Sequence, residues 1–529
     1  MFFKFLSFYA PTSTNIASFD EFIVNISKEL GVEEIKIDNG IYENVVKEFF
    51  CEKNIILSGT AGDGKTYILR KLFFEWGEEK EFYNFTPIIH TQNFKIYFIK
   101  DFTELSIKDK KFYLQKLEKS IFENSKERLI IAANDGILID SLKKFKMNRL
   151  LKLIENLIDG GEHKRVALFD LFQTSSAKNF SLLLDEIIKR AKETPCEYKD
   201  CVIHNNIKLL ENKNIKQQLI KLIKISDLNY EHLTFRKLYM IIANMILGYE
   251  KGVFTSCKEA NEYYKKKDKI KSAFYNNIFG DNLLKSDKEK IEGFLELNIG
   301  KESSNIIDEK LLYEEIEVEN YFFNKEKFEK IKEKFFEDNS NYEELNQYLI
   351  YLRRYLFFAN KSLSKELIIY KYLDEFIEII QNQKQDKKII QKLIKALNRI
   401  FLGELVDEDS ELFLASSFTN SFSKISDEII DEISIREIKF EFITSKIDNN
   451  FVKVYLIVDN VKLEMDLHMY EFLRRVSEGI LPLSFSTEYY EKVLNFKSKL
   501  LSNKKFNDFE LFDVENFKVH INYLSVEDL

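Results

Sequence analysis

Proline, glycine, cysteine, tryptophan and arginine are all scarce in this chain. Its 529 residues include 4 prolines, 16 glycines, 4 cysteines and 1 tryptophan, and 12 arginines stand against 67 lysines. So few cysteines exclude a disulfide scaffold and fit a reducing compartment. Because glycine and arginine are rare, a cluster of glycines or a well-placed arginine carries more information here than in an average sequence.

A strong excess of one charge is also missing. Lys and Arg number 79 against 87 Asp and Glu, so the formal net charge of −8 excludes a globally basic nucleic-acid-binding surface but not a local basic groove. The apolar stretch Leu238–Tyr249 is far shorter than the ~20 residues of a membrane span. The opening Met1–Tyr9 lacks the charge order and cleavage site of a secretory segment. We therefore expect a soluble, cytoplasmic protein of about two to four domains without membrane association.

Short apolar runs alternate with helical patterns in the first third of the chain. Strands alternating with helices predict an α/β domain whose parallel sheet is covered on both faces. Amphipathic helices dominate from 176 to 400, with a linker expected at 298–305. Alternating runs on either side of Asp459–Asn460 predict a hairpin, and 517–523 a further strand. The apolar runs lie at 54–58, 87–90, 95–99, 128–133 and 165–169.

A glycine cluster directly follows the first apolar run. It matches the phosphate-binding pattern G-x-x-x-x-G-K-[S/T] completely, in which backbone N–H groups and the start of a helix surround phosphate oxygens. Lys65 is expected to reach the β- and γ-phosphates, and the Thr66 hydroxyl to hold Mg²⁺. The sequence thus predicts an ATP and Mg²⁺ site, with an ordinary glycine-rich turn as the alternative. The matching residues are Gly59, Thr60, Ala61, Gly62, Asp63, Gly64, Lys65 and Thr66.

Hydrolysis needs further groups, and two other apolar runs end in candidates. Asp101 follows the third run, where a carboxylate can help hold Mg²⁺. Glu104 is a candidate to orient or deprotonate the attacking water, although the usual acid stands directly after the Asp. The fourth run resembles the sensor-1 strand of AAA+ ATPases, so Asn134 is expected to contact the γ-phosphate or its water. Asp135 competes with Asp101 for the metal, and turns or caps are the alternative for all four residues.

Arg236 begins a helix far downstream, with Thr234 as its expected cap. Its position resembles sensor 2 of AAA+ ATPases, which reaches over the nucleotide from a helical lid. The alternative is a solvated arginine beside Glu231. Two doublets, Arg353–Arg354 and Arg474–Arg475, are predicted to lie on solvated helix faces, with a trans-acting finger or DNA-phosphate contacts as alternatives.

Cys196, Cys201 and His204 have the spacing of three zinc ligands. A closed structural site needs a fourth ligand, and Cys51 and Cys257 are distant in the sequence. Isolated thiols in a reducing cell are therefore the favoured interpretation.

Taken in order, several segments resemble the family of the DNA phosphorothioation-dependent restriction protein DptF. The resemblance implies an ATPase subunit of a bacterial anti-phage complex that acts, with partner subunits, on DNA lacking phosphorothioate marks. It carries ATP binding onto 59–66 and a sensing role onto Asn134. It assigns no nuclease, and no metal-nuclease constellation stands out in the sequence. The segments are GTAGDGKT at 59–66, IAANDG at 131–136, the Cys pair before Asn205–Asn206, LTFR at 233–236, FYNNIFG at 274–280 and EGILP at 478–482.

The predicted fold is an α/β P-loop NTPase with an AAA+-like parallel sheet, a large helical region and a smaller C-terminal α+β region. The leading hypothesis is an ATPase whose nucleotide state switches or drives a restriction complex that contacts DNA, with oligomeric state left open. The alternatives are a nucleotide-gated scaffold with slow turnover and a C-terminal docking module, or an AAA+ loader unrelated to defence. The predicted segments are a helical lead at 1–40, the AAA+-like domain at 41–230, a helical lid at 231–300, a helical domain at 301–400 and the α+β domain at 401–529.

Overall fold

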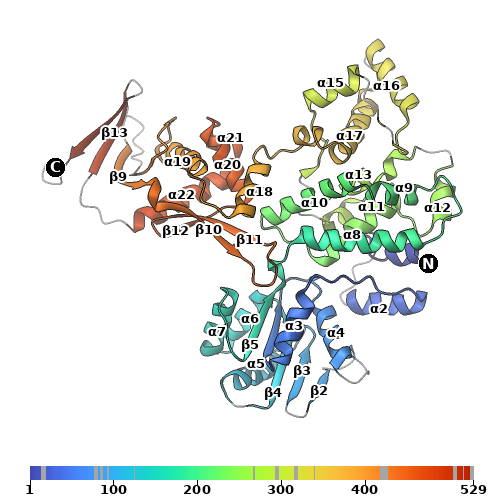
Figure 1. The fold of residues 1–529 in the computed structure, drawn as a ribbon, viewed down its shortest axis with the longest axis horizontal. Helices are drawn as coiled ribbons and strands as arrows, with labels where there is room; N and C mark the ends of the chain where they lie inside the picture. Colours follow the sequence, from blue (N-terminus) through green and yellow to red (C-terminus); the bar gives the residue numbers. More distant parts are fainter. Residues whose placement is uncertain are drawn as a thin grey trace. The chain divides into compact units, whose positions relative to one another are not determined.

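The chain divides into two compact units in the computed structural model (Figure 1). Unit 1 comprises Met1–Asp227, Glu231–Ile368 and Ser445–Phe451, and unit 2 comprises Leu228–Tyr230, Ile369–Thr444 and Val452–Leu529. This division is coarser than the five predicted segments, which stay a prediction. The structure describes residues 1–13, 19–76, 82–83, 87–91, 94–123, 125–265, 268–291, 297–314, 318, 320–338, 340–416, 427–503, 509–515 and 518–524.

A five-stranded sheet lies in the N-terminal part of unit 1. Its spatial order is β2-β3-β4-β1-β5, in which β3, β4, β1 and β5 are parallel and β2 pairs antiparallel with β3. The predicted α/β arrangement is confirmed, with β2 as the exception to the parallel order. The strands are β1 (Asn54–Ser58), β2 (Ile88–His90), β3 (Lys95–Ile99), β4 (Glu127–Ala133) and β5 (Val166–Asp170).

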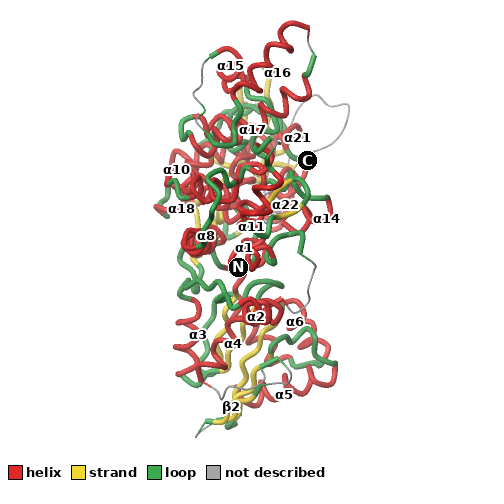
Figure 2. Tube along the Cα trace, turned by 90° about the vertical axis from the view of Figure 1, so that its right-hand side faces the viewer, coloured by secondary structure: helices red, strands yellow, loops and turns green. Residues whose placement is uncertain are grey.

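Helices cover both faces of this sheet, as Figures 1 and 2 show. Alternate residues of β1 point to opposite faces. Ile56 packs in one core with Leu117 and Leu138 of α5 and α6, whereas Leu57 packs in the other core with Leu69 of α4. Because helices cover both faces, a ligand can reach the sheet only at its edges. In open α/β sheets, ligands bind at the carboxyl ends of the strands. The covering helices are α3 (Ile41–Phe50), α4 (Lys65–Trp76), α5 (Ile107–Phe122), α6 (Asp135–Lys144) and α7 (Asn148–Ile158).

The remainder of unit 1 is mainly helical and is built around α11 (Phe235–Leu247). Thr234 caps this helix by accepting from the Lys237 N–H, as predicted, and the residues Met240–Leu247 are all buried. The contacts of α11 reach α1, α8, α9 and α13, so the start of the chain packs on a helix more than 200 residues later. The other elements are α1 (Phe2–Ser7), α2 (Phe19–Leu30), η1 (Leu171–Gln173), α8 (Ser176–Glu193), α9 (Val202–Leu210), α10 (Lys213–Leu228), β6 (Gly248–Tyr249), β7 (Gly252–Val253), α12 (Cys257–Tyr263), η2 (Ile270–Ser272), α13 (Phe274–Asn277), α14 (Lys285–Lys288), η3 (Glu289–Ile291), α15 (Asn305–Tyr313), α16 (Lys325–Asp338), α17 (Tyr342–Ala359) and η5 (Leu363–Leu367).

One short piece of the C-terminal sequence, Ser445–Phe451, also belongs to unit 1. Its Asp448 is buried and accepts a hydrogen bond of 2.9 Å from the Ser175 N–H, at the start of α8. The Ser175 hydroxyl in turn donates to the buried Asp227 over 2.7 Å. The beginning of α8 is therefore held by acids from two distant parts of the chain.

The arginine doublets lie in buried ion pairs, so the prediction of solvated helix faces is wrong for most of them. Arg353 and Arg354 are 2% and 1% exposed, and they pair at 2.6 Å with Asp308 and Asp281. Their guanidinium groups also donate to the Gly300 and Ile299 carbonyl oxygens, inside the segment expected to be a linker. That segment is thus anchored within unit 1.

In unit 2 the second doublet is likewise anchored. Arg474 is buried and pairs with Glu375 over 2.7 Å, whereas Arg475 is only half-buried and pairs with Glu471. Buried guanidinium groups satisfied in this way have no free face for a phosphate, so the alternative of a trans-acting finger or DNA contact also fails for Arg353, Arg354 and Arg474.

Unit 2 combines helices with two antiparallel sheets. The predicted hairpin is confirmed, because β11 pairs with β12 and both turn residues, Asp459 and Asn460, have positive φ. The predicted strand at 517–523 corresponds to β14, although Phe517 itself lies outside the described residues. The sheet orders are β10-β11-β12 and β14-β13-β9-β8. The elements are α18 (Leu373–Asn382), α19 (Lys387–Leu402), β8 (Glu411–Ser416), β9 (Asp427–Ser434), η6 (Ile435–Glu437), β10 (Ile438–Thr444), β11 (Val452–Val458), β12 (Val461–Glu464), α20 (Leu467–Ser477), α21 (Pro482–Phe485), α22 (Thr487–Ser502), β13 (Phe509–Glu515) and β14 (Lys518–Leu524).

Among the described residues, no helix combines the length and the apolar character that crossing a membrane requires.

Candidate functional site

The glycine-rich loop lies between the fully buried strand β1 and the helix α4. Gly59 and Gly62 have φ of 142° and 99°, in the range that favours glycine. A Cβ atom on Gly62 would lie 2.9 Å from the Arg236 Cβ and 3.0 Å from the Thr234 Oγ1. The loop therefore needs glycine both for its curvature and for the close approach of α11.

The Lys65 side chain folds back over this loop. Its Nζ donates to the Gly59 carbonyl oxygen over 2.9 Å and to the Thr60 carbonyl oxygen over 2.6 Å. Burial lowers the pKa of Lys65, and nearby carboxylates oppose this shift. The amine is thus held among neutral carbonyl acceptors, which are weaker partners than a charged phosphate oxygen. The opposing carboxylates are Asp63, Asp101 and Asp135.

A buried pair, Asp63 and His232, braces the loop from within. The Asp63 side chain is 1% exposed; it accepts from the Thr60 N–H over 2.6 Å and from the His232 Nε2 over 2.6 Å. The His232 Nδ1 is buried without a hydrogen-bond partner among the described residues. Asp63 therefore shapes the loop, and His232, which no local sequence pattern indicates, ties the loop to the residues before α11.

Further acids gather at the carboxyl edge of the sheet. The Ser58 hydroxyl, at the end of β1, donates to Asp170 at the end of β5 over 3.4 Å. Burial raises the pKa of Asp135, and Asp170 adds to this, whereas the Ser58 hydroxyl and Lys65 oppose it. The Asp135 Oδ1 is buried and lacks a hydrogen-bond partner in the described part of the chain. Asp135 is thus a partly desolvated acid that interacts with Asp170 and Lys65.

The other predicted hydrolysis residues are placed differently. Asp101 and Glu104 are exposed and line the same cavity as Lys65 and Thr66. Asn134 caps α6, with its Oδ1 accepting from the Ile137 N–H over 3.4 Å, and it does not line the cavity. Asp170 was missed, although it follows an apolar run in the same way as Asp101.

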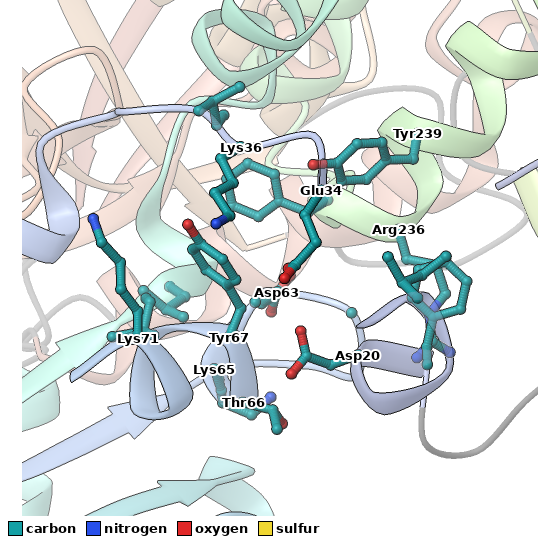
Figure 3. A pocket seen from close by; sticks show the side chains of 18 of the residues that line it. Asp20, Glu34, Lys36, Asp63, Lys65, Thr66, Tyr67, Lys71, Arg236 and Tyr239 are labelled. Atoms are coloured by element: carbon teal, nitrogen blue, oxygen red, sulfur yellow. The ribbon is translucent and has the colours of Figure 1, made fainter. Parts of the chain in front are cut away.

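The cavity beside the loop has a volume of about 370 Å³. Its walls come from the loop and α4 on one side and from α2, the segment 34–39 and α11 on the others. Figure 3 shows Asp20 and Glu34, from separate segments, converging between Tyr67 and Arg236. The cavity therefore combines the glycine-rich loop with acidic and aromatic walls.

The N-terminal segment is fixed to the site by an ion-pair network. Arg70 on α4 pairs with Asp20 over 2.9 Å and with Glu34 over 2.7 Å, and its side chain is 7% exposed. Tyr239 on α11 donates to the Ile35 carbonyl oxygen over 2.7 Å. Residues of the predicted 1–40 lead are thus part of the cavity wall, a role that no local sequence pattern indicates.

Arg236 lines the cavity next to the loop. The backbone N–H of Arg236 donates to the Gly62 carbonyl oxygen over 3.2 Å, and the guanidinium carbon lies 4.7 Å from the centre of the Phe19 ring. Burial lowers the pKa of Arg236, and its Nε has no hydrogen-bond partner among the described residues. The side chain is half-buried against Phe19 rather than solvated.

Comparison with family models, with curated proteins and with solved structures finds no match to this chain.

Proposed function

We propose that the chain is an ATPase that binds ATP with Mg²⁺ in the cavity between the glycine-rich loop and α11. The observation that supports this most is the complete G-x-x-x-x-G-K-T pattern in its required context. The pattern follows a buried parallel strand, begins a helix and lies at the carboxyl edge of the sheet.

The residues present suit the triphosphate and its metal. In this proposal, backbone N–H groups of the loop and the start of α4 hold phosphate oxygens, and Lys65 exchanges its carbonyl partners for the β- and γ-phosphates. The Thr66 hydroxyl and a carboxylate, for which we keep Asp101 ahead of Asp135, would hold Mg²⁺. The metal would neutralise charge that develops on the phosphates. Glu104 stays the candidate to position water, and Asn134 the candidate γ-phosphate sensor.

Aromatic residues that line the cavity suit the rest of a nucleotide. Tyr67 and Tyr239 supply aromatic surface, and the Tyr9 ring stacks on Tyr239 with centroids 4.5 Å apart. In this proposal, Arg236 adds a charged contact to the terminal phosphate. Such a contact differs between ATP and ADP, which is what a nucleotide switch requires.

Replacement of Lys65 tests the site. Lys65→Ala is expected to lower ATP turnover about 100-fold or more, because the positive charge that stabilises the transferring phosphate is lost. Phosphate release and binding of a fluorescent ATP analogue measure the effect, and Lys144→Ala, an exposed lysine of α6, is the matched control. A Lys65→Ala protein that hydrolyses ATP at the unsubstituted rate would refute the assignment.

We propose further that this ATPase serves a restriction complex that acts on DNA lacking phosphorothioate marks. The support is the resemblance of the ordered segments to the DptF family. Steady-state turnover with and without duplex DNA, alone and with candidate partner subunits, separates a driven motor from a slow nucleotide-gated scaffold. Turnover that no DNA and no partner subunit alters would favour the loader or remodeller hypothesis instead.

A further inference from the structure

The structure adds a fourth side chain, Cys257, to the three candidate ligands that sequence spacing had already grouped. The ligand atoms of Cys196, Cys201, His204 and Cys257 all lie within 4.8 Å of one another. Cys201 and Cys257 are buried and Cys196 is half-buried. The expectation of isolated thiols is therefore wrong, because the fourth donor that a closed site needs comes from a residue 53 positions after His204.

These four residues join three elements in the helical part of unit 1. Cys196 and Cys201 lie in the connection between α8 and α9, His204 lies in the first turn of α9, and Cys257 begins α12. Both α8 and α12 contact α9, and Figure 1 shows the three helices together. A bond through one shared ion would fasten the connection between α8 and α9 to the start of α12.

The imidazole is oriented as a ligand. The His204 Nδ1 lies 3.5 Å from the Cys257 Sγ, and its Nε2 lies 3.3 Å from the Thr194 carbonyl oxygen. A proton on Nε2 that is donated to this carbonyl leaves the Nδ1 lone pair pointing at the sulfurs. Metal-binding histidines commonly have such a carbonyl partner, which fixes the ring and its tautomer.

We propose that Cys196, Cys201, His204 and Cys257 bind one Zn²⁺ as a closed structural site. Three thiolates and one imidazole are a tetrahedral donor set that zinc prefers, and four protein ligands leave no position for substrate or water. In a tetrahedron with Zn–S bonds of about 2.3 Å, sulfurs lie about 3.8 Å apart. The present separations need to close by only about 1 Å, which side-chain rotation supplies.

The ion would stabilise more than its own loop. The Phe3 ring of α1 packs edge-on against His204 with centroids 5.6 Å apart. Fixing His204 therefore also fixes the surface on which the first helix of the chain rests. This role is independent of the nucleotide site, and a protein that fails to bind ATP would still hold the metal.

Metal content of the full-length protein, purified under reducing conditions, tests the proposal. Elemental analysis is expected to find one zinc and no iron per chain. Cys257→Ser is expected to lose most of the zinc, whereas Cys51→Ser, which removes the exposed cysteine outside the cluster, keeps it. His204→Cys is expected to retain zinc, because a fourth thiolate restores the donor set.

Titration of the unsubstituted protein avoids dependence on variants that fail to fold. A mercurial reagent is added to block the thiols while a chromogenic chelator reports free zinc. One zinc is expected to be released as the three cysteines of the cluster react. Three outcomes overturn the proposal: a protein that neither contains zinc nor takes it up stoichiometrically, iron in place of zinc, or a native disulfide among the three cysteines. Equal zinc contents in Cys51→Ser and Cys257→Ser would do the same.

Discussion

Arg236→Ala should weaken the preference of the protein for ATP over ADP. The guanidinium lies half-buried at the cavity with an unpartnered Nε, so much of its desolvation cost is already met before ligand arrives. A hydrogen bond to a charged group contributes about 1.5–3 kcal/mol, and each 1.4 kcal/mol corresponds to a tenfold change in affinity. We therefore expect ATP affinity to fall about tenfold to a hundredfold, with little change for ADP.

Titration calorimetry with both nucleotides measures this ratio. Loss of the contact between Arg236 and Phe19 should cost only about 0.5–1 kcal/mol of stability, and a thermal melt checks that the variant remains folded. Arg236→Lys should lie between the two proteins, and Arg436→Ala, an exposed arginine of unit 2, serves as control. Equal losses for ATP and ADP, or no loss at all, would refute the reasoning.

Two further predictions concern acids. Asp101→Asn should lower Mg²⁺-dependent ATP hydrolysis by on the order of a hundredfold. Asp140→Asn, which changes an exposed aspartate of α6, is the control. If Asp135→Asn abolishes hydrolysis and Asp101→Asn does not, Asp135 is the acid that holds the metal. Burial raises the pKa of Asp466 to about 6. Between about pH 4 and 6 the folded protein therefore binds more protons than the unfolded chain. The free energy of unfolding consequently falls as the pH rises through this window. Asp466→Asn should therefore add roughly 1–3 kcal/mol of stability at pH 7 and almost none below pH 4. Urea unfolding at several pH values measures this gain, with Asp386→Asn, at an exposed helix cap, as the control. A gain of the same size at all pH values would contradict the prediction.

Features that depend on neighbouring residues could be predicted from the sequence. The glycine-rich loop, the Thr234 cap and the Asp459–Asn460 turn each depend on residues within a few positions of one another, and each lies where it was expected. The apolar runs at 54–58 and 95–99 are strands for the same reason. Local backbone preference and side-chain period are sufficient for such elements.

What could not be predicted depends on contacts across long stretches of chain. Asp63 meets His232 from 169 positions away, and no spacing rule connects them. The charge of Arg353 and Arg354 suggested solvent, because the sequence does not show that Asp308, Asp281 and backbone carbonyls enclose them. Cys257 appeared too distant to join the other thiols for the same reason.

The piece Ser445–Phe451 has a consequence for anyone who divides this protein into fragments. The chain leaves unit 2 after β10, contributes Asp448 to the start of α8 and then returns to form β11. A fragment ending at Ile368 lacks that carboxylate and leaves the buried Ser175 N–H without its acceptor, a loss of about 1–3 kcal/mol. Neither unit is a contiguous stretch of the gene, so no single stop codon separates them. A recombinant fragment that ends at Ile368 therefore needs residues 445–451 grafted back onto it.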